Sequence, residues 1–193
     1  MKKIYILLSR TQTLPSRAIH SILGGRFTHV SIAIRPVTDE FYSFARRTLN
    51  NPFNAGFIVE NVHTHVFSKY PNCQCAVFSL DVDEETYEKI RKILNHFYDN
   101  IEQFNYNFLG LIPAKLGIKL HRKHHFTCSQ FVATVLQKAQ AVKLPKEASL
   151  MMPNDFLKIT KLVKVYSGRL GDCKISINDR VKTFGKNRLV KNI

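Results

Sequence analysis

The chain has 193 residues, which is enough for one domain with a continuous hydrophobic core. Its 29 Lys and Arg residues outnumber 14 Asp and Glu residues, which gives a formal net charge of +15. Apolar residues make up 45% of the chain, and this share excludes a disordered basic tail protein. The composition therefore predicts a folded, strongly basic protein.

The cysteines and the first residues of the chain predict a reducing compartment. Four cysteines are too few for a small disulfide scaffold, and none is spaced as in a zinc finger. The apolar run from Ile4 to Leu8 is shorter than the core of a signal peptide, and no stretch approaches the length of a membrane span. We expect a cytoplasmic protein with reduced thiols and no transmembrane segment.

The first half of the chain alternates short apolar runs with turn residues, a pattern typical of strands. The predicted strands cover residues 4–8, 28–34, 40–44, 56–62 and 75–80. One predicted helix interrupts them, beginning at Pro15 and ending at Gly24. In the strand 28–34, apolar residues alternate with His29 and Ser31, so the two sets face opposite sides of the sheet.

The chain from residue 81 onward predicts three helices. The acidic segment 81–85 supplies an N-cap and first-turn acids for a helix that ends near Tyr98. Its expected buried face consists of Tyr87, Ile90, Ile93, Leu94 and Phe97. An aromatic connector follows over residues 105–118, then a helix over 126–136 and a short one over 153–162. With no repeat or linker in the sequence, we expect one domain over residues 1–167 and a basic extension over 168–193.

Cys128 is the residue whose sequence context points most directly to chemistry. Thr127 is a good N-cap, which places Cys128 in the first turn of its helix. Unpaired N–H groups and the positive end of the helix dipole favour a thiolate there, and the basic run 119–125 adds positive potential. The alternative is a small buried thiol that only packs under the helix.

A thiolate enzyme also needs an imidazole to take and return a proton. Seven of the eight histidines lie in other settings. His121, His124 and His125 lie in a basic loop, His63 and His65 form an H-x-H pair without a third metal ligand, and His20 and His96 lie on helix faces. His29 begins a strand, on the face opposite the apolar residues. A lone strand histidine is usually structural, and the presence of Cys128 is what favours a catalytic role.

Two segments of the chain resemble a known superfamily. Residues 28–33 (THVSIA) followed by residues 126–132 (FTCSQFV) resemble the circularly permuted NlpC-type papain-like cysteine hydrolases, which include the lecithin:retinol acyltransferase-like proteins. In that group the histidine strand precedes the cysteine helix, the reverse of ordinary papain-like enzymes. Supporting matches are the apolar first strand, the helix before His29, residues 106–110 (YNFLG) and residues 153–156 (PNDF).

The resemblance implies an α+β fold in which an antiparallel sheet packs against the helix that carries Cys128. It also implies that Cys128 is the nucleophile, His29 the base and the helix N–H groups the donors to the oxyanion. The resemblance also implies a third residue, which orients the imidazole and lies on the strand after the histidine strand. This sequence departs from that pattern, because no His, Asn or Glu stands in the middle of residues 41–46. Ser43 is one candidate for this role, and Glu60 on the next strand is a better acceptor. Beside the cysteine, Tyr106 and Ser129 are the expected substrate-binding residues.

The expected function is a cysteine-dependent hydrolase, an amidase, peptidase or esterase acting through a thioester acyl-enzyme without cofactor or metal. Its substrate would be an amide or ester of a small molecule, a peptide or a lipid. The alternative is a non-catalytic or acyltransferase-like module that binds anionic lipid or nucleic acid. The tail from 174 to 193 carries six basic residues against one acid and could contact an anionic surface. No nucleic-acid-binding motif accompanies this charge.

Overall fold

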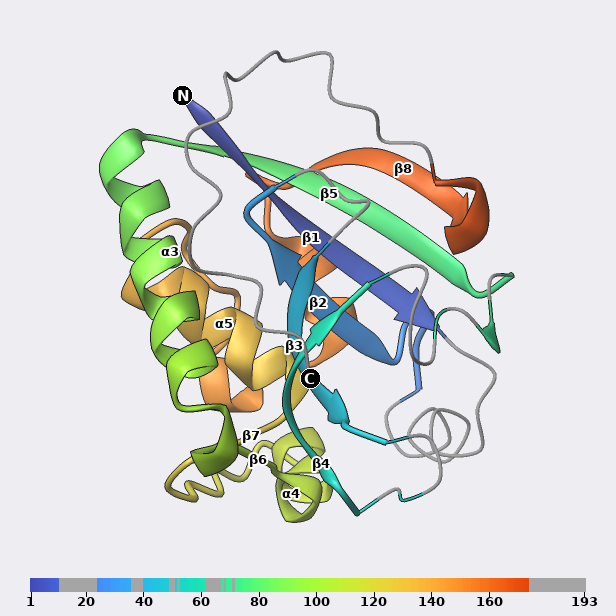
Figure 1. Cartoon of the computed structure of the whole chain (residues 1–193), viewed down its shortest axis with the longest axis vertical. Coiled ribbons are helices and arrows are strands. Elements are labelled where there is room, and N and C mark those ends of the chain that lie inside the picture. Colours follow the sequence, from blue (N-terminus) through green and yellow to red (C-terminus); the bar gives the residue numbers. More distant parts are fainter. Residues whose placement is uncertain are drawn as a thin grey trace.

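The computed structural model describes residues 1–10, 24–35, 40–48, 51, 53–61, 67, 69–70 and 72–173. At the centre of this part of the chain lies an eight-stranded sheet, shown in Figure 1. Its strands are β1 (Lys2–Arg10), β2 (His29–Ala33), β3 (Phe41–Arg46), β4 (Ala55–Glu60), β5 (Gln74–Val82), β6 (Asn105–Tyr106), β7 (His125–Phe126) and β8 (Val163–Arg169). The spatial order is β7-β6-β4-β3-β2-β1-β5-β8, and only the β6–β7 pair is parallel. The expected α+β class with a mainly antiparallel sheet is therefore confirmed.

Strand β1 lies between β2 and β5, and both of its faces are buried because a hydrophobic core packs on each side of the sheet there. Ile4, Ile6 and Leu8 point into one hydrophobic core, whereas Tyr5 and Leu7 point into a second core on the opposite face. This double burial explains why the sequence shows a continuous apolar run here instead of an alternating pattern.

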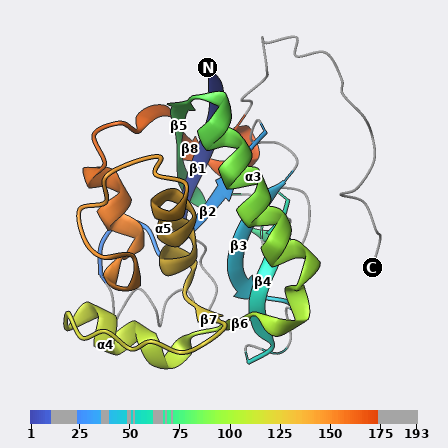
Figure 2. The ribbon, with the colours of Figure 1, turned by 90° about the vertical axis from the view of Figure 1, so that its left-hand side faces the viewer.

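Among the described residues, helices α3 (Glu84–Asp99) and α5 (Cys128–Lys138) cover one face of the sheet, as Figures 1 and 2 show. Asp83 is the N-cap of α3, and its carboxylate accepts a hydrogen bond of 2.7 Å from the Thr86 N–H. The predicted apolar face of α3 packs on the larger core, with Ile90, Leu94 and Phe97 buried. The predictions of both helices and of the buried face of α3 are confirmed.

A smaller core lies on the other face of the sheet, where β8 and the 3-10 helix η5 (Leu170–Asp172) complete it. Leu170 is buried in this core, and its N–H donates to the Cys73 carbonyl at 3.0 Å. Strand β8 was not predicted, because its exposed, basic sequence lacks an alternating apolar pattern. It extends past residue 167, and residues 174–193 of the expected basic extension lie outside the described residues.

The connector and the last predicted helix differ from the expectations. The connector contains β6, the 3-10 helix η2 (Phe108–Gly110) and the short helix α4 (Leu111–Lys115). The segment expected to be helical over 153–162 is a 3-10 helix, η4 (Pro153–Lys158), that ends four residues early because Ile159 adopts an extended backbone. The predicted helix that begins at Pro15 lies outside the described residues. No helix in the described ranges has both the length and the apolar character needed to cross a membrane.

Candidate active site

His29 lies at the start of β2, and its imidazole contacts a buried carboxylate. Glu60, the last residue of β4, is 5% exposed, and its Oε2 lies 2.9 Å from His29 Nε2. The Ser31 hydroxyl donates to the same carboxylate oxygen at 2.6 Å and lies 3.2 Å from His29 Nε2. Residues 29 and 31 share a face of β2, so the strand itself brings the hydroxyl and the imidazole to one carboxylate.

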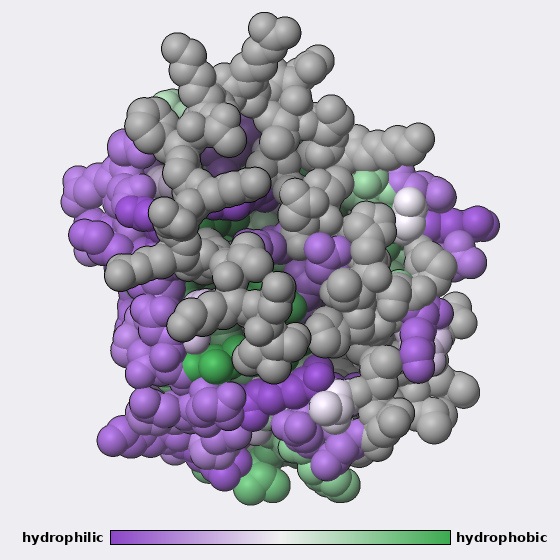
Figure 3. Space-filling view, in the orientation of Figure 1, coloured by the Kyte–Doolittle hydropathy of each residue, from purple (hydrophilic) through white to green (hydrophobic). Residues whose placement is uncertain are grey.

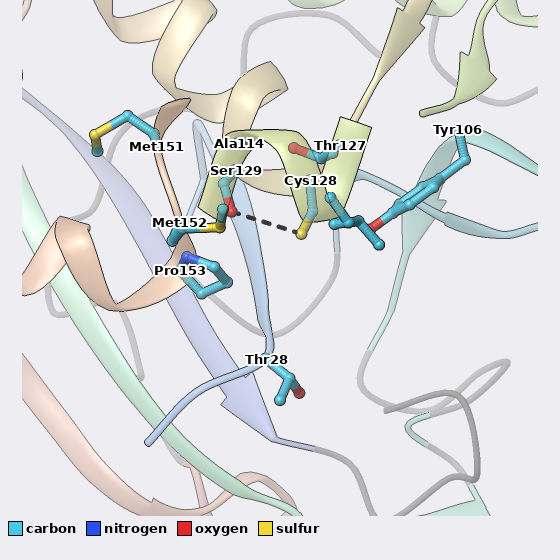
Figure 4. Close-up of a pocket in the computed structure, with 10 residues that line it drawn as sticks. Thr28, Tyr106, Ala114, Thr127, Cys128, Ser129, Met151, Met152 and Pro153 are labelled. Atoms are coloured by element: carbon cyan, nitrogen blue, oxygen red, sulfur yellow. Dashed lines mark hydrogen bonds between the residues drawn. The ribbon is translucent and has the colours of Figure 1, made fainter. Parts of the chain in front are cut away.

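Cys128 is the first residue of α5 and is 4% exposed. The Thr127 hydroxyl caps the helix by accepting a hydrogen bond of 3.1 Å from the Gln130 N–H, as the sequence predicted. The Cys128 Sγ lies 3.9 Å from the Ser129 Oγ, the contact drawn as a dashed line in Figure 4. The His29 side chain and the Val30 N–H both act on the thiol and lower its pKa. The fold thus brings Cys128 and His29, far apart in the sequence, close enough for each to shift the pKa of the other.

The pKa values of these two groups move in opposite directions. Burial acts to raise the pKa of the Cys128 thiol, but the hydrogen bond and charge of His29 and the N–H of Val30 outweigh it and lower that pKa below 9.0. Burial acts to lower the pKa of His29, but the charge of Glu60 and the hydrogen bonds to Cys128 and Glu60 raise it well above 6.5. Both shifts stabilise a thiolate beside an imidazolium.

Tyr106 approaches Cys128 from the short parallel pair of β6 and β7. Tyr106 is in register with Phe126, two residues before the cysteine, and in Figure 4 its hydroxyl points towards Cys128. Burial, the charge of Cys128 and a hydrogen bond to the thiol together raise the pKa of Tyr106 well above 10.0. Tyr106 therefore keeps its proton beside the sulfur.

A pocket opens beside the Cys128 sulfur, as Figure 4 shows, and most of its wall is apolar. Its lining residues are Thr28, Tyr106, Leu111, Ala114, Thr127, Cys128, Ser129, Met151, Met152 and Pro153. Helix α4 supplies one side of the wall, and the segment before η4 supplies the other. The two expected substrate-binding residues, Tyr106 and Ser129, both line this pocket.

Of the two candidates for the third, imidazole-orienting role, Glu60 contacts the imidazole and Ser43 does not. The Ser43 hydroxyl donates to the Val30 carbonyl at 2.7 Å, so it links β3 to β2 instead of contacting the imidazole. Glu60 is the candidate for the third role that touches His29. His125 binds the Lys123 carbonyl at 2.7 Å, and the ring of His124 packs on Phe104.

His20, His63 and His65 lie outside the described residues. Within the described residues, no group of three or more His, Cys, Asp and Glu side chains could hold a metal ion.

Two residues near the site were not identified from the sequence. Ser31 could have been found, because the two-residue period of the strand places it beside His29. Asn154 could not, because its contacts cross more than a hundred positions of the chain. Its side chain accepts hydrogen bonds from the Arg26 and Phe27 N–H groups at 2.9 and 3.1 Å and donates to the Phe27 carbonyl at 2.8 Å. These bonds fix the segment that leads into β2.

The sequence matches no model of a known protein family, and it matches no curated protein. The functional argument therefore depends on the geometry of Cys128, His29, Glu60 and Tyr106.

Proposed function

We propose that the protein is a cysteine-dependent hydrolase of amides or esters, with the permuted papain-like arrangement of the NlpC type. The observation that carries this proposal is the placement of Cys128 at the start of α5, where His29 lowers its pKa, together with the contact of 2.9 Å between His29 Nε2 and Glu60. The order of a histidine strand before a cysteine helix, packed on a mainly antiparallel sheet, supports the same assignment.

In the first step the Cys128 thiolate attacks the substrate carbonyl carbon. A C–S bond forms, and the carbonyl electron pair moves to oxygen. The start of α5 offers N–H groups to this oxyanion, and the protonated Tyr106 hydroxyl is a second donor. Because Glu60 and Ser31 occupy His29 Nε2, we assign the proton transfers to His29 Nδ1. The imidazolium gives its proton to the departing amine or alcohol as the scissile bond breaks.

Water completes the reaction. His29, now neutral, takes a proton from a water molecule, and the resulting hydroxide attacks the thioester carbonyl. The C–S bond then breaks, the acid leaves, and the thiolate and imidazolium are restored. The apolar wall of the pocket favours a substrate with an apolar group next to the scissile carbonyl.

The proposal is tested by trapping the acyl-enzyme. The protein is mixed with p-nitrophenyl butyrate, and p-nitrophenol release and intact mass are followed together. We expect a burst of p-nitrophenol and a butyryl group on Cys128, both absent from Cys128→Ala.

Cys173→Ala is the matched control, because Cys173 packs against the smaller core on the opposite face. It should keep both the burst and the adduct. Equal ester cleavage by the wild type and by Cys128→Ala, with no adduct, would overturn the proposal and favour a non-catalytic binding module.

A further inference from the structure

The segment from Phe108 to Leu120 leaves an unusual number of large apolar side chains in solvent. Leu116 is 69% exposed, although leucine is usually buried. Five neighbours along the same segment are exposed as well: Phe108, Leu109, Ile112, Ile118 and Leu120. Six such residues within thirteen positions form a patch of the kind that marks an interaction surface.

The same segment carries only positive charge. No acidic residue occurs between Glu102 and Glu147, whereas Lys115, Lys119, Arg122 and Lys123 fall inside this interval. Lys119 pairs with Glu147 across the surface. Arg122 and Lys123 form no ion pair with an acid in the described residues, so their charge faces solvent or a partner.

The patch lies at one end of the molecule, next to the Cys128 pocket. Figures 1 and 2 place α4 at this end, and Figure 3 shows apolar side chains emerging there beside hydrophilic ones. While Ile112 of α4 points outward, Leu111 and Ala114 of the same helix line the pocket. Helix α4 therefore contributes side chains both to the exposed patch and to the pocket wall beside the Cys128 sulfur.

We propose that residues 108–123 dock onto the surface of an anionic phospholipid bilayer. The exposed Leu, Ile and Phe side chains enter the boundary between headgroups and acyl chains, and the basic side chains meet the lipid phosphates. Charge complementarity selects this partner, because the segment 108–123 itself supplies cations and no acid beside its apolar residues. The inference does not depend on Cys128 being catalytic.

The experiment is cosedimentation of the whole chain with two kinds of vesicle. One is phosphatidylcholine alone, and the other contains equal parts of phosphatidylcholine and phosphatidylglycerol. We expect binding to the anionic vesicles and little binding to the neutral ones. Leu116→Ser with Ile118→Ser should weaken the binding by at least about tenfold, because two large apolar side chains no longer enter the lipid.

Matched variants separate the patch from the general charge of the protein. Val163→Ser with Val165→Ser removes two exposed apolar residues from β8 and should leave binding unchanged. Arg122→Gln with Lys123→Gln should weaken binding more than Lys89→Gln with Lys92→Gln on α3, although both pairs lose two charges. Cys128→Ala should bind like the wild type, so failure of the hydrolase proposal would not affect this test.

Three outcomes would overturn the docking proposal. The wild type could fail to bind either kind of vesicle. The Leu116 and Val163 pairs could weaken binding equally, which would indicate attraction by overall charge alone. The patch variant could instead abolish self-association seen in solution without altering vesicle binding, and the partner would then be a second copy of the chain.

Discussion

The carboxylate of Glu60 governs how much positive charge the neighbouring imidazole holds. It is buried, and it accepts hydrogen bonds from both His29 and Ser31. A neutral side chain of the same shape would retain much of the packing but lose the attraction for the imidazolium.

Glu60→Gln should therefore lower the pKa of His29 and, through it, raise the pKa of Cys128 towards 9.0. The measurement is the rate of iodoacetamide alkylation of Cys128 against pH, read by peptide mass spectrometry. In the wild type, Cys128 should react below pH 9.0, whereas Cys73 and Cys75 should stay inert because burial raises their pKa values to about 11 and about 12.

Ser43→Ala is the matched control for Glu60→Gln. It also alters a buried polar group of the sheet, but that group bonds the Val30 carbonyl and not the imidazole. Its alkylation midpoint should equal that of the wild type. An unchanged midpoint in Glu60→Gln would contradict the role assigned to the carboxylate.

Tyr106→Phe tests the hydroxyl beside the sulfur. If the hydroxyl donates to the oxyanion, its loss should reduce kcat/KM for p-nitrophenyl butyrate by roughly a hundredfold, the usual cost of one such donor. The ring is retained, so the pocket wall should survive. Equal kcat/KM in Tyr106→Phe and wild type would show that the hydroxyl takes no part in the reaction.

At the scale of elements, the turn before η4 depends on one buried carboxylate. Asp155 accepts a hydrogen bond from the Met152 N–H at 3.1 Å and pairs with Lys146 and Lys158 at 2.9 and 3.0 Å. Although burial opposes ionisation, these partners lower the pKa of Asp155 below 3.8. A carboxyl group with a lowered pKa stabilises the fold above its unfolded value of 3.8, and this contribution is lost as the pH falls through the folded-state pKa.

Asp155→Asn should therefore reduce the free energy of unfolding by about 1 to 2 kcal/mol at neutral pH, because the cap and two partly screened ion pairs are weakened. In acid, once Asp155 itself is protonated, the two proteins should approach equal stability. Urea unfolding at both pH values measures the difference. A constant difference across the pH range would mean that the charge of Asp155 is not what matters.

The elements that the sequence predicted well share a local cause. Asp83 and Thr127 are followed by helices because each side chain bonds an N–H three positions later, and such caps are legible from the sequence. Strand β8 was missed because an edge strand with exposed residues keeps no apolar alternation. Glu60 could be suggested as an acceptor for an imidazole, but its contact with His29 arises from strand order, which the residues alone do not give.

At the scale of the whole molecule, the sheet separates two cores of different size. The candidate active site lies at Cys128, in the larger core, and the smaller core holds Leu170 and β8 against the opposite face. No group that shifts the pKa of Cys128 or His29 belongs to β8 or η5, so Leu170 should contribute to stability without tuning the thiolate.

Leu170→Ala should reduce the free energy of unfolding by about 2 to 4 kcal/mol, the usual cost of a buried leucine, while leaving the alkylation midpoint of Cys128 unchanged. Val165→Ala is the matched control, because this β8 side chain is 45% exposed and its loss should have little effect. Urea unfolding and the alkylation assay provide the two readings. A shifted midpoint in Leu170→Ala would mean that the sheet transmits changes from one face to the other.

The parallel pairing of β6 with β7 determines which segments of this protein can change in sequence without moving the site. It holds Tyr106 opposite Phe126, so the chain between them leaves the sheet and returns to it at two positions that the pairing fixes. Residues 115–123 can therefore be exchanged for another insert without altering these two positions, whereas Leu111 and Ala114 must stay because they line the pocket. The proposed chemistry at Cys128 and the proposed docking surface are thus separable traits, each open to change while the other is conserved.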